Sequence, residues 1–185
     1  MRRVAAARIA LAAALACVGL SQVASAGWIH AKAILAQQLI ATAWDDARGG
    51  MARRPWPWAD MRPVARMTIA SRGVDVFILD STSPRALAFG PGYVSGTSNS
   101  VVVAHRDTHF AFLRTLAAGD EIEVESLAGR HARYRVREVA IVDKGDARVL
   151  DEADAAQLTL ITCYPFVAIR PGTTLRYIVI AARVA

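Results

Sequence analysis

Beyond residue 63 the chain consists of short strand-like segments separated by turn residues. Two of them, 64–69 and 74–79, flank a Ser-Arg-Gly turn and predict a β-hairpin. Another, 121–125, alternates acidic and apolar residues, as expected of a strand with one face in solvent. Because no long helices alternate with these segments, nothing in the pattern requires a parallel sheet. The sequence therefore predicts a mainly β domain whose mostly antiparallel strands close into a barrel.

The rest of this region continues the same pattern, within a chain of 185 residues. Further strands are expected at 100–105, 131–142, 158–163 and 174–182, short helices at 85–89 and 109–118, and a loop or short helix at 151–154. Setting an N-terminal segment aside leaves roughly 130–150 residues, which is enough for one hydrophobic core and requires no second domain.

The N-terminus has the composition of an export segment. Arg2, Arg3 and Arg8 accompany a run of apolar residues that extends to Leu20, and Ala24-Ser25-Ala26 has the small residues of a signal-peptide cleavage site. Apolar residues resume after this site, which favours an uncleaved signal anchor, although a cleaved signal peptide fits the same features. The arginines at the start favour an orientation with the amino end inside and the remaining chain outside the membrane. In either case the β domain is expected to be exported.

Three regions are expected along the chain. They are a signal anchor at 1–30, a juxtamembrane helix and strap at 31–62, and the β domain at 63–185. The helix is expected to end near Trp44, where the helical spacing of apolar residues ends, and a linker follows. Prolines then exclude a helix in the strap, whose Trp56 and Trp58 are expected to pack on the β domain.

The formal net charge of +6 does not indicate a nucleic-acid-binding protein. Three of these charges belong to the N-terminal arginines, and the later basic residues are scattered among acids. The chain contains no cluster of lysines and arginines interleaved with aromatic residues. We therefore expect no nucleic-acid partner.

Cys163 is the strongest candidate for a catalytic residue. The other cysteine, Cys17, lies in the apolar N-terminal segment, so Cys163 is expected to be a free thiol at the end of a strand. A free cysteine is often only a small buried hydrophobe. Two other residues favour a nucleophile: His105, at the end of another expected strand, and Arg176, on the last strand. A cation close to the thiol would favour the reactive thiolate.

Each partner of Cys163 has an alternative. Arg170 is closer to Cys163 in sequence than Arg176, but it lies in an expected loop. His109 forms a His-x-x-x-His pair with His105, a spacing that binds zinc when both residues lie on a helix. The glutamate of the zinc-protease motif is absent, and a strand ending at His105 would separate the two rings.

Carboxylates also offer no clear metal site. Glu121, Glu123 and Glu125 alternate along one expected strand, which indicates a solvated face rather than a calcium site. We therefore expect no metal and no cofactor.

Three separate segments resemble the sortase family of cysteine transpeptidases. Thr159-Leu-Ile-Thr-Cys163 is similar to the sortase Thr-Leu-x-Thr-Cys motif, Ala104-His-Arg-Asp-Thr-His-Phe110 to the segment around the sortase histidine, and Leu175-Arg-Tyr177 to its arginine strand. The Pro-Trp-Pro-Trp-Ala-Asp strap, together with residues 87–92 and 162–166, is most similar to the Gram-negative (class GN) sortases of proteobacteria. The resemblance covers roughly residues 28–182 and departs from the family at Ala104, where glycine is usual, and at Tyr93, where histidine is common.

The resemblance implies a closed eight-stranded β-barrel with short helices, preceded by an N-terminal membrane helix. It implies that Cys163 is the nucleophile, that Arg176 stabilises the oxyanion and binds the substrate backbone, and that His105 transfers protons. Thr162 and Ala104 are implied as substrate-binding residues. The substrate would be a Leu-Pro-x-Thr-Gly-like sorting signal, cleaved between Thr and Gly through a thioester.

The resemblance also implies partners and a location. The expected partners are an exported protein with a C-terminal sorting signal and an amine acceptor in the cell envelope. The expected location is the inner membrane, crossed once, with the catalytic domain on the periplasmic side. Two alternatives remain open: an exported L,D-transpeptidase acting on peptidoglycan stem peptides, although its Ser-x-Gly-Cys pattern is absent, and a non-catalytic binding domain tethered to the membrane.

Overall fold

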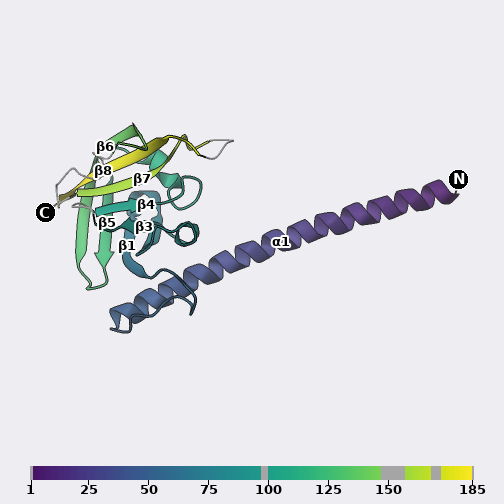
Figure 1. Cartoon of the computed structure of the whole chain (residues 1–185), viewed down its shortest axis with the longest axis horizontal. Coiled ribbons are helices and arrows are strands. Elements are labelled where there is room, and N and C mark those ends of the chain that lie inside the picture. The colour runs from purple at the N-terminus through teal and green to yellow at the C-terminus, as the bar shows by residue number, and fades with distance from the viewer. Residues whose placement is uncertain (1, 97–99, 147–156, 168–171, 185) are drawn as a thin grey trace. The chain divides into compact units, whose positions relative to one another are not determined.

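A computed structural model describes residues 2–96, 100–146, 157–167 and 172–184 of the chain. The chain forms two compact units, residues 1–38 and residues 39–185. Helix α1 (Arg2–Arg48) accounts for the first unit and ends within the second (Figure 1). The helix therefore continues beyond the end expected near Trp44 and occupies part of the expected linker. No helix within the described residues combines the length and the apolar character that crossing a membrane requires.

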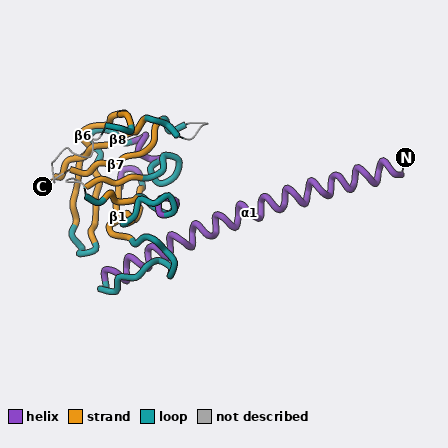
Figure 2. Tube along the Cα trace, in the orientation of Figure 1, coloured by secondary structure: helices purple, strands orange, loops and turns teal. Residues whose placement is uncertain are grey.

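Eight strands form a closed barrel in the second unit (Figures 1 and 2). The strands are β1 (Pro63–Ile69), β2 (Val74–Leu79), β3 (Gly92–Val94), β4 (Ser100–Val103), β5 (Glu121–Ser126), β6 (His131–Asp143), β7 (Gln157–Tyr164) and β8 (Leu175–Val184). Their order around the barrel is β1-β2-β3-β4-β7-β8-β6-β5, and β1 pairs with β5 to close it. Only the β2–β3 and β4–β7 pairs are parallel among these neighbours. The expected mainly β, mostly antiparallel barrel is confirmed.

Short 3-10 helices connect several strands. They are η1 (Ala70–Arg72), η2 (Ala86–Ala88) and η3 (Ala111–Thr115). The short helical segments expected at 85–89 and 109–118 are thus confirmed as 3-10 helices of three and five residues. Gly73 closes the β1–β2 hairpin with φ of 62°, a conformation that favours glycine. Strand β3 was not expected, and the segment 151–154 lies outside the described residues.

Alternation along the central strands separates the core from the outer face. Val102 of β4 and Leu158 and Leu160 of β7 are buried in the barrel core together with Val179 of β8. Successive side chains of a strand point to opposite faces, so Ile161 and Cys163 of β7 point outward. The same buried residues that form the core therefore determine the direction of the candidate nucleophile.

The C-terminal end of α1 packs against the barrel within the second unit. Ile40 is fully buried in a small cluster with Met61, Leu79 and Ala86. Trp44 is also buried, and its ring centroid lies 5.8 Å from that of Phe77. Burial of these large apolar side chains makes the last turns of α1 part of the barrel domain.

The strap between α1 and β1 contains turns but no regular helix or strand, as its prolines predicted. Trp56 packs edge-on against Phe89, with ring centroids 5.0 Å apart. Trp58 instead is 76% exposed, so the expectation that both tryptophans pack on the domain is wrong for Trp58. The cause is a tight turn in which the Ala59 amide donates to the Trp56 carbonyl oxygen at 3.0 Å. Because of this turn, the Trp56 ring points to the domain and the Trp58 ring points to solvent.

Candidate active site

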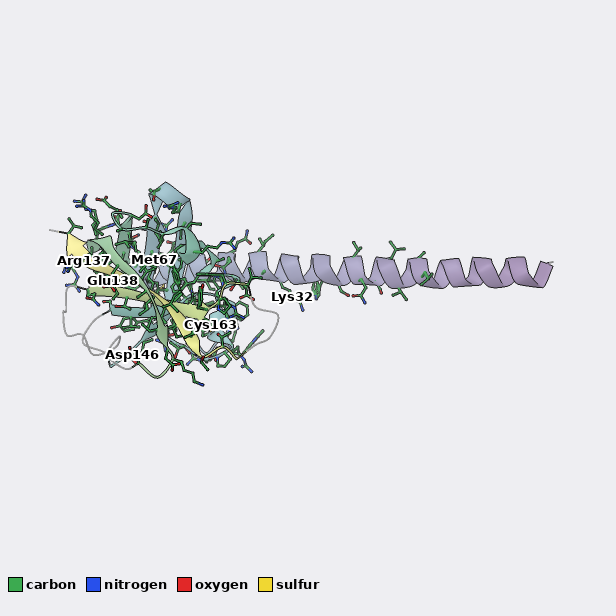
Figure 3. The ribbon with its side chains drawn as sticks, turned by 90° about the horizontal axis from the view of Figure 1, so that it is seen from above. Lys32, Met67, Arg137, Glu138, Asp146 and Cys163 are labelled. Atoms are coloured by element: carbon green, nitrogen blue, oxygen red, sulfur yellow. The ribbon has the colours of Figure 1, made fainter. Side chains whose placement is uncertain are left out.

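Cys163 and Arg176 lie directly opposite each other on neighbouring strands. In the antiparallel β7–β8 pair, the Cα partner of Cys163 is Arg176. Directly opposed residues project from the same face of a sheet, with Cβ atoms about 5 Å apart. Cys163 is a half-buried free thiol, and Figure 3 shows it near the end of the barrel away from Arg137 and Glu138. The structure therefore brings together the thiol and the cation that the sequence identified.

His105 follows β4, which runs parallel to β7. The register pairs Val103 with Ile161, and the Ala104 amide donates to the Ile161 carbonyl oxygen at 3.3 Å, one step beyond the strand. Continuing this register by two residues sets His105 beside Cys163. Its side chain is exposed, so the imidazole is accessible to a substrate. The three candidate catalytic residues thus come from the ends of three adjacent strands.

Thr162 and Ala104 connect the two strands that carry the thiol and the imidazole. The Thr162 hydroxyl is buried and donates a 2.7 Å hydrogen bond to the Ala104 carbonyl oxygen. This bond joins the residue before Cys163 to the residue before His105. Because both side chains are buried, their contribution here is to hold the frame of the site. A direct role of Thr162 and Ala104 in substrate binding stays a prediction.

Arg176 is held by its own loop. Its Nη1 donates to the carbonyl oxygens of Thr173 and Leu175 at 3.0 and 2.9 Å. Within the described part of the chain, Nε and Nη2 have no hydrogen-bond partner. A planar guanidinium anchored through one nitrogen keeps its other N–H groups available for a carbonyl oxygen or an oxyanion. The alternative cation, Arg170, lies outside the described residues.

An apolar groove of about 230 Å³ lies on the outer face of the strands next to Arg176. Its lining residues are Val94, Val103, Val142, Asp143, Lys144, Asp146, Ile161, Arg176 and Ile178. Ile161 is two residues before Cys163 and pairs with Ile178, so the groove floor shares a face with the thiol. Sequence reasoning missed this groove. Alternation along the strands of Cys163 and Arg176 predicts that Ile161 and Ile178 share their face. No local sequence signal predicts that residues of β3 and β6 line the same groove.

Three aromatic rings pack where β7 and β8 carry Cys163 and Arg176, on the opposite face of these strands. The centroid of Tyr177 lies 6.2 Å from that of Tyr164 and 4.9 Å from that of Phe166. Phe166 and Tyr177 also pack against the barrel core. Burial, and then the nearby Tyr164, raises the pKa of Tyr177, so its hydroxyl stays neutral. These rings support the β7 and β8 ends from the core side.

The described residues contain no group of three or more histidine, cysteine or carboxylate side chains arranged to hold a metal ion. The β5 carboxylates instead lie against basic side chains. Glu121 pairs with Arg135 at 2.7 Å, Glu123 with His131 at 2.6 Å, and Glu125 with Arg48 at 3.0 Å. The pairs of Glu121 and Glu123 lie on a solvated surface, where such pairs contribute little to stability, whereas the Glu125 side chain is only 13% exposed.

The comparison with family models decides the family. The model of the sortase domain matches residues 67–184, which include every strand from β2 onward and all three candidate catalytic residues. The chain belongs to the sortase family. Sortases are cysteine transpeptidases, and in this chain the matched region contains the free thiol of Cys163 directly opposite Arg176.

Solved sortase structures share the fold of this sortase. Sortase A from Corynebacterium diphtheriae is 25% identical with a TM-score of 0.60, and the match covers 69% of this chain and 63% of that chain. Sortase C-1 from Actinomyces oris is 31% identical with a TM-score of 0.57, covering 68% of this chain and 77% of that chain. Clostridium perfringens sortase C, solved with the C-terminal cell wall sorting motif, is 23% identical with a TM-score of 0.59, covering 83% and 90%. Curated protein sequences yield no significant match.

Proposed function

We propose that this sortase is anchored in a membrane and cleaves an exported protein at a Leu-Pro-x-Thr-Gly-like C-terminal signal, between Thr and Gly. It then transfers the acyl group to an amine. The observation that carries this proposal is the opposition of Cys163 and Arg176 on β7 and β8, with His105 at the end of the strand beside them. A thiol, a permanent cation and an imidazole are the groups that a thioester-forming transpeptidase needs.

In the first half-reaction, the Cys163 thiolate attacks the carbonyl carbon of the signal's threonine and forms an S–C bond. The charge that develops on the carbonyl oxygen is stabilised by N–H groups of Arg176. When this oxyanion collapses, the C–N bond to glycine breaks, and protonated His105 gives its proton to the leaving amine. The products are a thioester on Cys163 and a peptide with a free glycine amine.

The second half-reaction uses the same groups in reverse. The acceptor amine attacks the thioester carbonyl carbon, and neutral His105 takes the proton that the amine loses. Arg176 again stabilises the oxyanion, and its collapse breaks the S–C bond and releases the Cys163 thiolate. A new amide joins the exported protein to the acceptor. No atom changes its oxidation state, so the reaction requires no redox partner.

The apolar groove supports a sorting signal as the substrate. Val103, Ile161 and Ile178 line the groove, which shares a face with Cys163. An extended peptide presents alternate side chains to such a surface, and the leucine and proline of the signal are apolar. A peptide lying in the groove would bring its scissile carbonyl to Cys163 and Arg176.

We further propose that the N-terminal segment anchors the protein in the inner membrane, with the barrel on the periplasmic side. Support comes from the sequence: Arg2, Arg3 and Arg8 precede an uncharged segment, 9–31. Within the first unit, Leu15, Leu20 and Trp28 lie on different sides of the helix and are more than 60% exposed. The Pro-Trp strap and the segment around Cys163 support assignment to the Gram-negative class. The partners are then an exported protein with a sorting signal and an amine in the cell envelope.

The reaction is tested with a labelled sorting peptide and a free amine. Wild-type protein should yield the amide product and a transient adduct on Cys163 visible by mass spectrometry, and Cys163→Ala should yield neither. A peptidoglycan stem peptide in the same assay tests the L,D-transpeptidase alternative, which family membership already disfavours. If Cys163 does not react with a sorting-peptide electrophile, the protein is a non-catalytic binding domain and the proposal is wrong.

Anchoring is tested separately. The mass of the mature N-terminus shows whether cleavage follows Ala26, and alkaline extraction of membranes shows whether the chain is integral. A chain that begins at Gly27 and is fully extracted would contradict the anchor. Periplasmic exposure of Cys163 is tested with a membrane-impermeant thiol reagent on intact and permeabilised cells.

A further inference from the structure

His109 is a half-buried histidine that the proposed reaction does not use. It lies between β4 and η3, and its Nε2 is 3.4 Å from the carbonyl oxygen of Ala88 in η2. Burial lowers the pKa of His109, the Ala88 carbonyl opposes this effect, and the charge of His105 lowers it further. The ring is therefore neutral near neutral pH, and a hydrogen bond to a carbonyl oxygen requires the proton on Nε2.

Hydrogen bonds fix the backbone around His105 on the side that faces the barrel. The Ala104 carbonyl oxygen accepts the buried Thr162 hydroxyl at 2.7 Å, and the His105 carbonyl oxygen accepts the Phe110 amide at 3.0 Å. These bonds close a tight loop that ends in the buried ring of Phe110. The His109 ring reaches from this loop to η2, which belongs to a different connection. It thus joins the loop of the catalytic imidazole to the neighbouring η2 turn.

The η2 turn is in turn held by the strap. The Phe89 amide donates to the Ala86 carbonyl oxygen at 2.8 Å, and Trp56 packs on the Phe89 ring. Ala86 itself is fully buried in the cluster that includes Ile40 of α1. Contacts therefore run without a gap from the strap through Phe89 and the Ala88 carbonyl to His109.

We propose that His109 is a positioning residue for His105, and that Trp56 supports it through Phe89 and Ala88. This inference rests on the proposed function, because only a proton-transferring His105 needs such placement. A general acid must lie within hydrogen-bond reach of the leaving amine, and a misplacement of about 1 Å can cost up to about 100-fold in rate. Strand β4 does not supply that precision alone, since His105 follows the last strand residue, Val103, by two positions.

The two strap tryptophans provide a matched pair for the test in the full-length protein. Trp56 contacts Phe89, whereas Trp58 is 76% exposed. We expect Trp56→Ala to lower kcat for the sorting peptide about tenfold with KM within about twofold, and Trp58→Ala to leave both unchanged. Trp56→Phe keeps an aromatic edge against Phe89 and should recover most of kcat. Equal kcat values for Trp56→Ala and Trp58→Ala would overturn the role of the strap.

The second pair tests the imidazole itself. His109→Gln can keep an N–H donor toward the Ala88 carbonyl, whereas His109→Leu fills similar space without one. We expect kcat to fall about tenfold in His109→Leu and to recover in His109→Gln, with little change in KM. A merely structural role would lower the melting temperature of both variants without separating their kcat values, and this outcome would overturn the proposal. If His109→Leu does not fold at the assay temperature, the tryptophan pair decides.

A double-mutant cycle tests whether the residues act as one unit. Because Trp56 and His109 act through the same Ala88 carbonyl, the loss in kcat for Trp56→Ala with His109→Leu should be clearly smaller than the product of the single losses. A fully multiplicative loss would contradict the link. Wild-type protein with no peptide cleavage would refute the proposed function, whereas active wild-type protein with unaffected variants would refute only this inference.

Discussion

Arg176 faces Cys163 across the β7–β8 pair, and its Nη1 is bound to the carbonyl oxygens of its own loop. The strand register, rather than proximity in sequence, brings this cation to the thiol. The guanidinium can be anchored at one nitrogen and still donate to a developing oxyanion from the others. The guanidinium thus has a fixed position next to the thiol, and its Nε and Nη2 have no hydrogen-bond partner among the described residues.

Arg176→Lys should lower kcat/KM by about 100-fold, because a lysine keeps the charge but cannot anchor one nitrogen while donating from another. Peptide cleavage kinetics check this. Arg183→Lys, exposed near the other end of β8, should change kcat/KM by less than about twofold. Arg170→Lys should also be mild, and a larger loss there than in Arg176→Lys would mean that Arg170 is the catalytic cation.

Thr162→Val should lower both stability and kcat. The substitution removes the hydroxyl that binds the Ala104 carbonyl oxygen and leaves that buried acceptor unpaired, at a cost of about 1–3 kcal/mol in the free energy of unfolding. Chemical denaturation and peptide cleavage measure the two effects. Thr159→Val is the control, because Thr159 is buried on the same strand but binds only the Gln157 amide among the described residues. Equal kcat values in the two variants would contradict the link between the catalytic strands.

Gly92→Ala should destabilise the barrel by about 1–3 kcal/mol. A Cβ at this position would collide with the carbonyl oxygen of Ser81, and Gly92 pairs with both Leu79 and Val103 where β3 joins β2 and β4. Thermal unfolding measures the loss. Gly145→Ala is the control, since the nearest atom to a Cβ there is 3.5 Å away. A Gly92→Ala protein as stable as the control would show that the backbone can move apart without cost.

Asp120→Asn should lower stability at neutral pH and have less effect in acid. The Ala117 backbone amide, followed by the Arg72 guanidinium, holds the pKa of Asp120 below its usual range. The folded state thus favours the ionised carboxylate, and this stabilisation is present above pH ~4 and disappears as the pH falls through the lower folded pKa. Denaturation at several pH values should show a gap of about 1 kcal/mol at pH 7 that closes in acid.

Glu138→Gln is the matched control for the acid-dependent gap, because Glu138 is exposed and forms no ion pair within the described part of the chain. Its stability should follow the wild type at each pH. A gap for Asp120→Asn that stays constant with pH would mean that the amide side chain, and not the charge, accounts for the loss.

Most strands were predictable because alternation is a local property of a strand. The hairpin of β1 and β2 and the half-exposed β5 follow directly from spacing and turn residues. Strand β3 was not predictable, since its three residues carry no pattern and are ordered by pairing with β2 and β4. Trp58 was misjudged because composition does not reveal the direction of a ring after a tight turn.

The kinds of chemical group at the site could be identified from the residues alone. A free thiol at the end of a strand, a histidine at the end of another and an arginine on the last strand are visible in the residues, because reactivity belongs to the side chain. The tertiary structure determined that β4 lies beside β7, with Val103 paired to Ile161 and the Ala104 amide donating to the Ile161 carbonyl oxygen. It also decided that His109 contacts the Ala88 carbonyl. Hydrogen-bonded pairing between distant segments depends on the whole barrel closing, so no local pattern contains it.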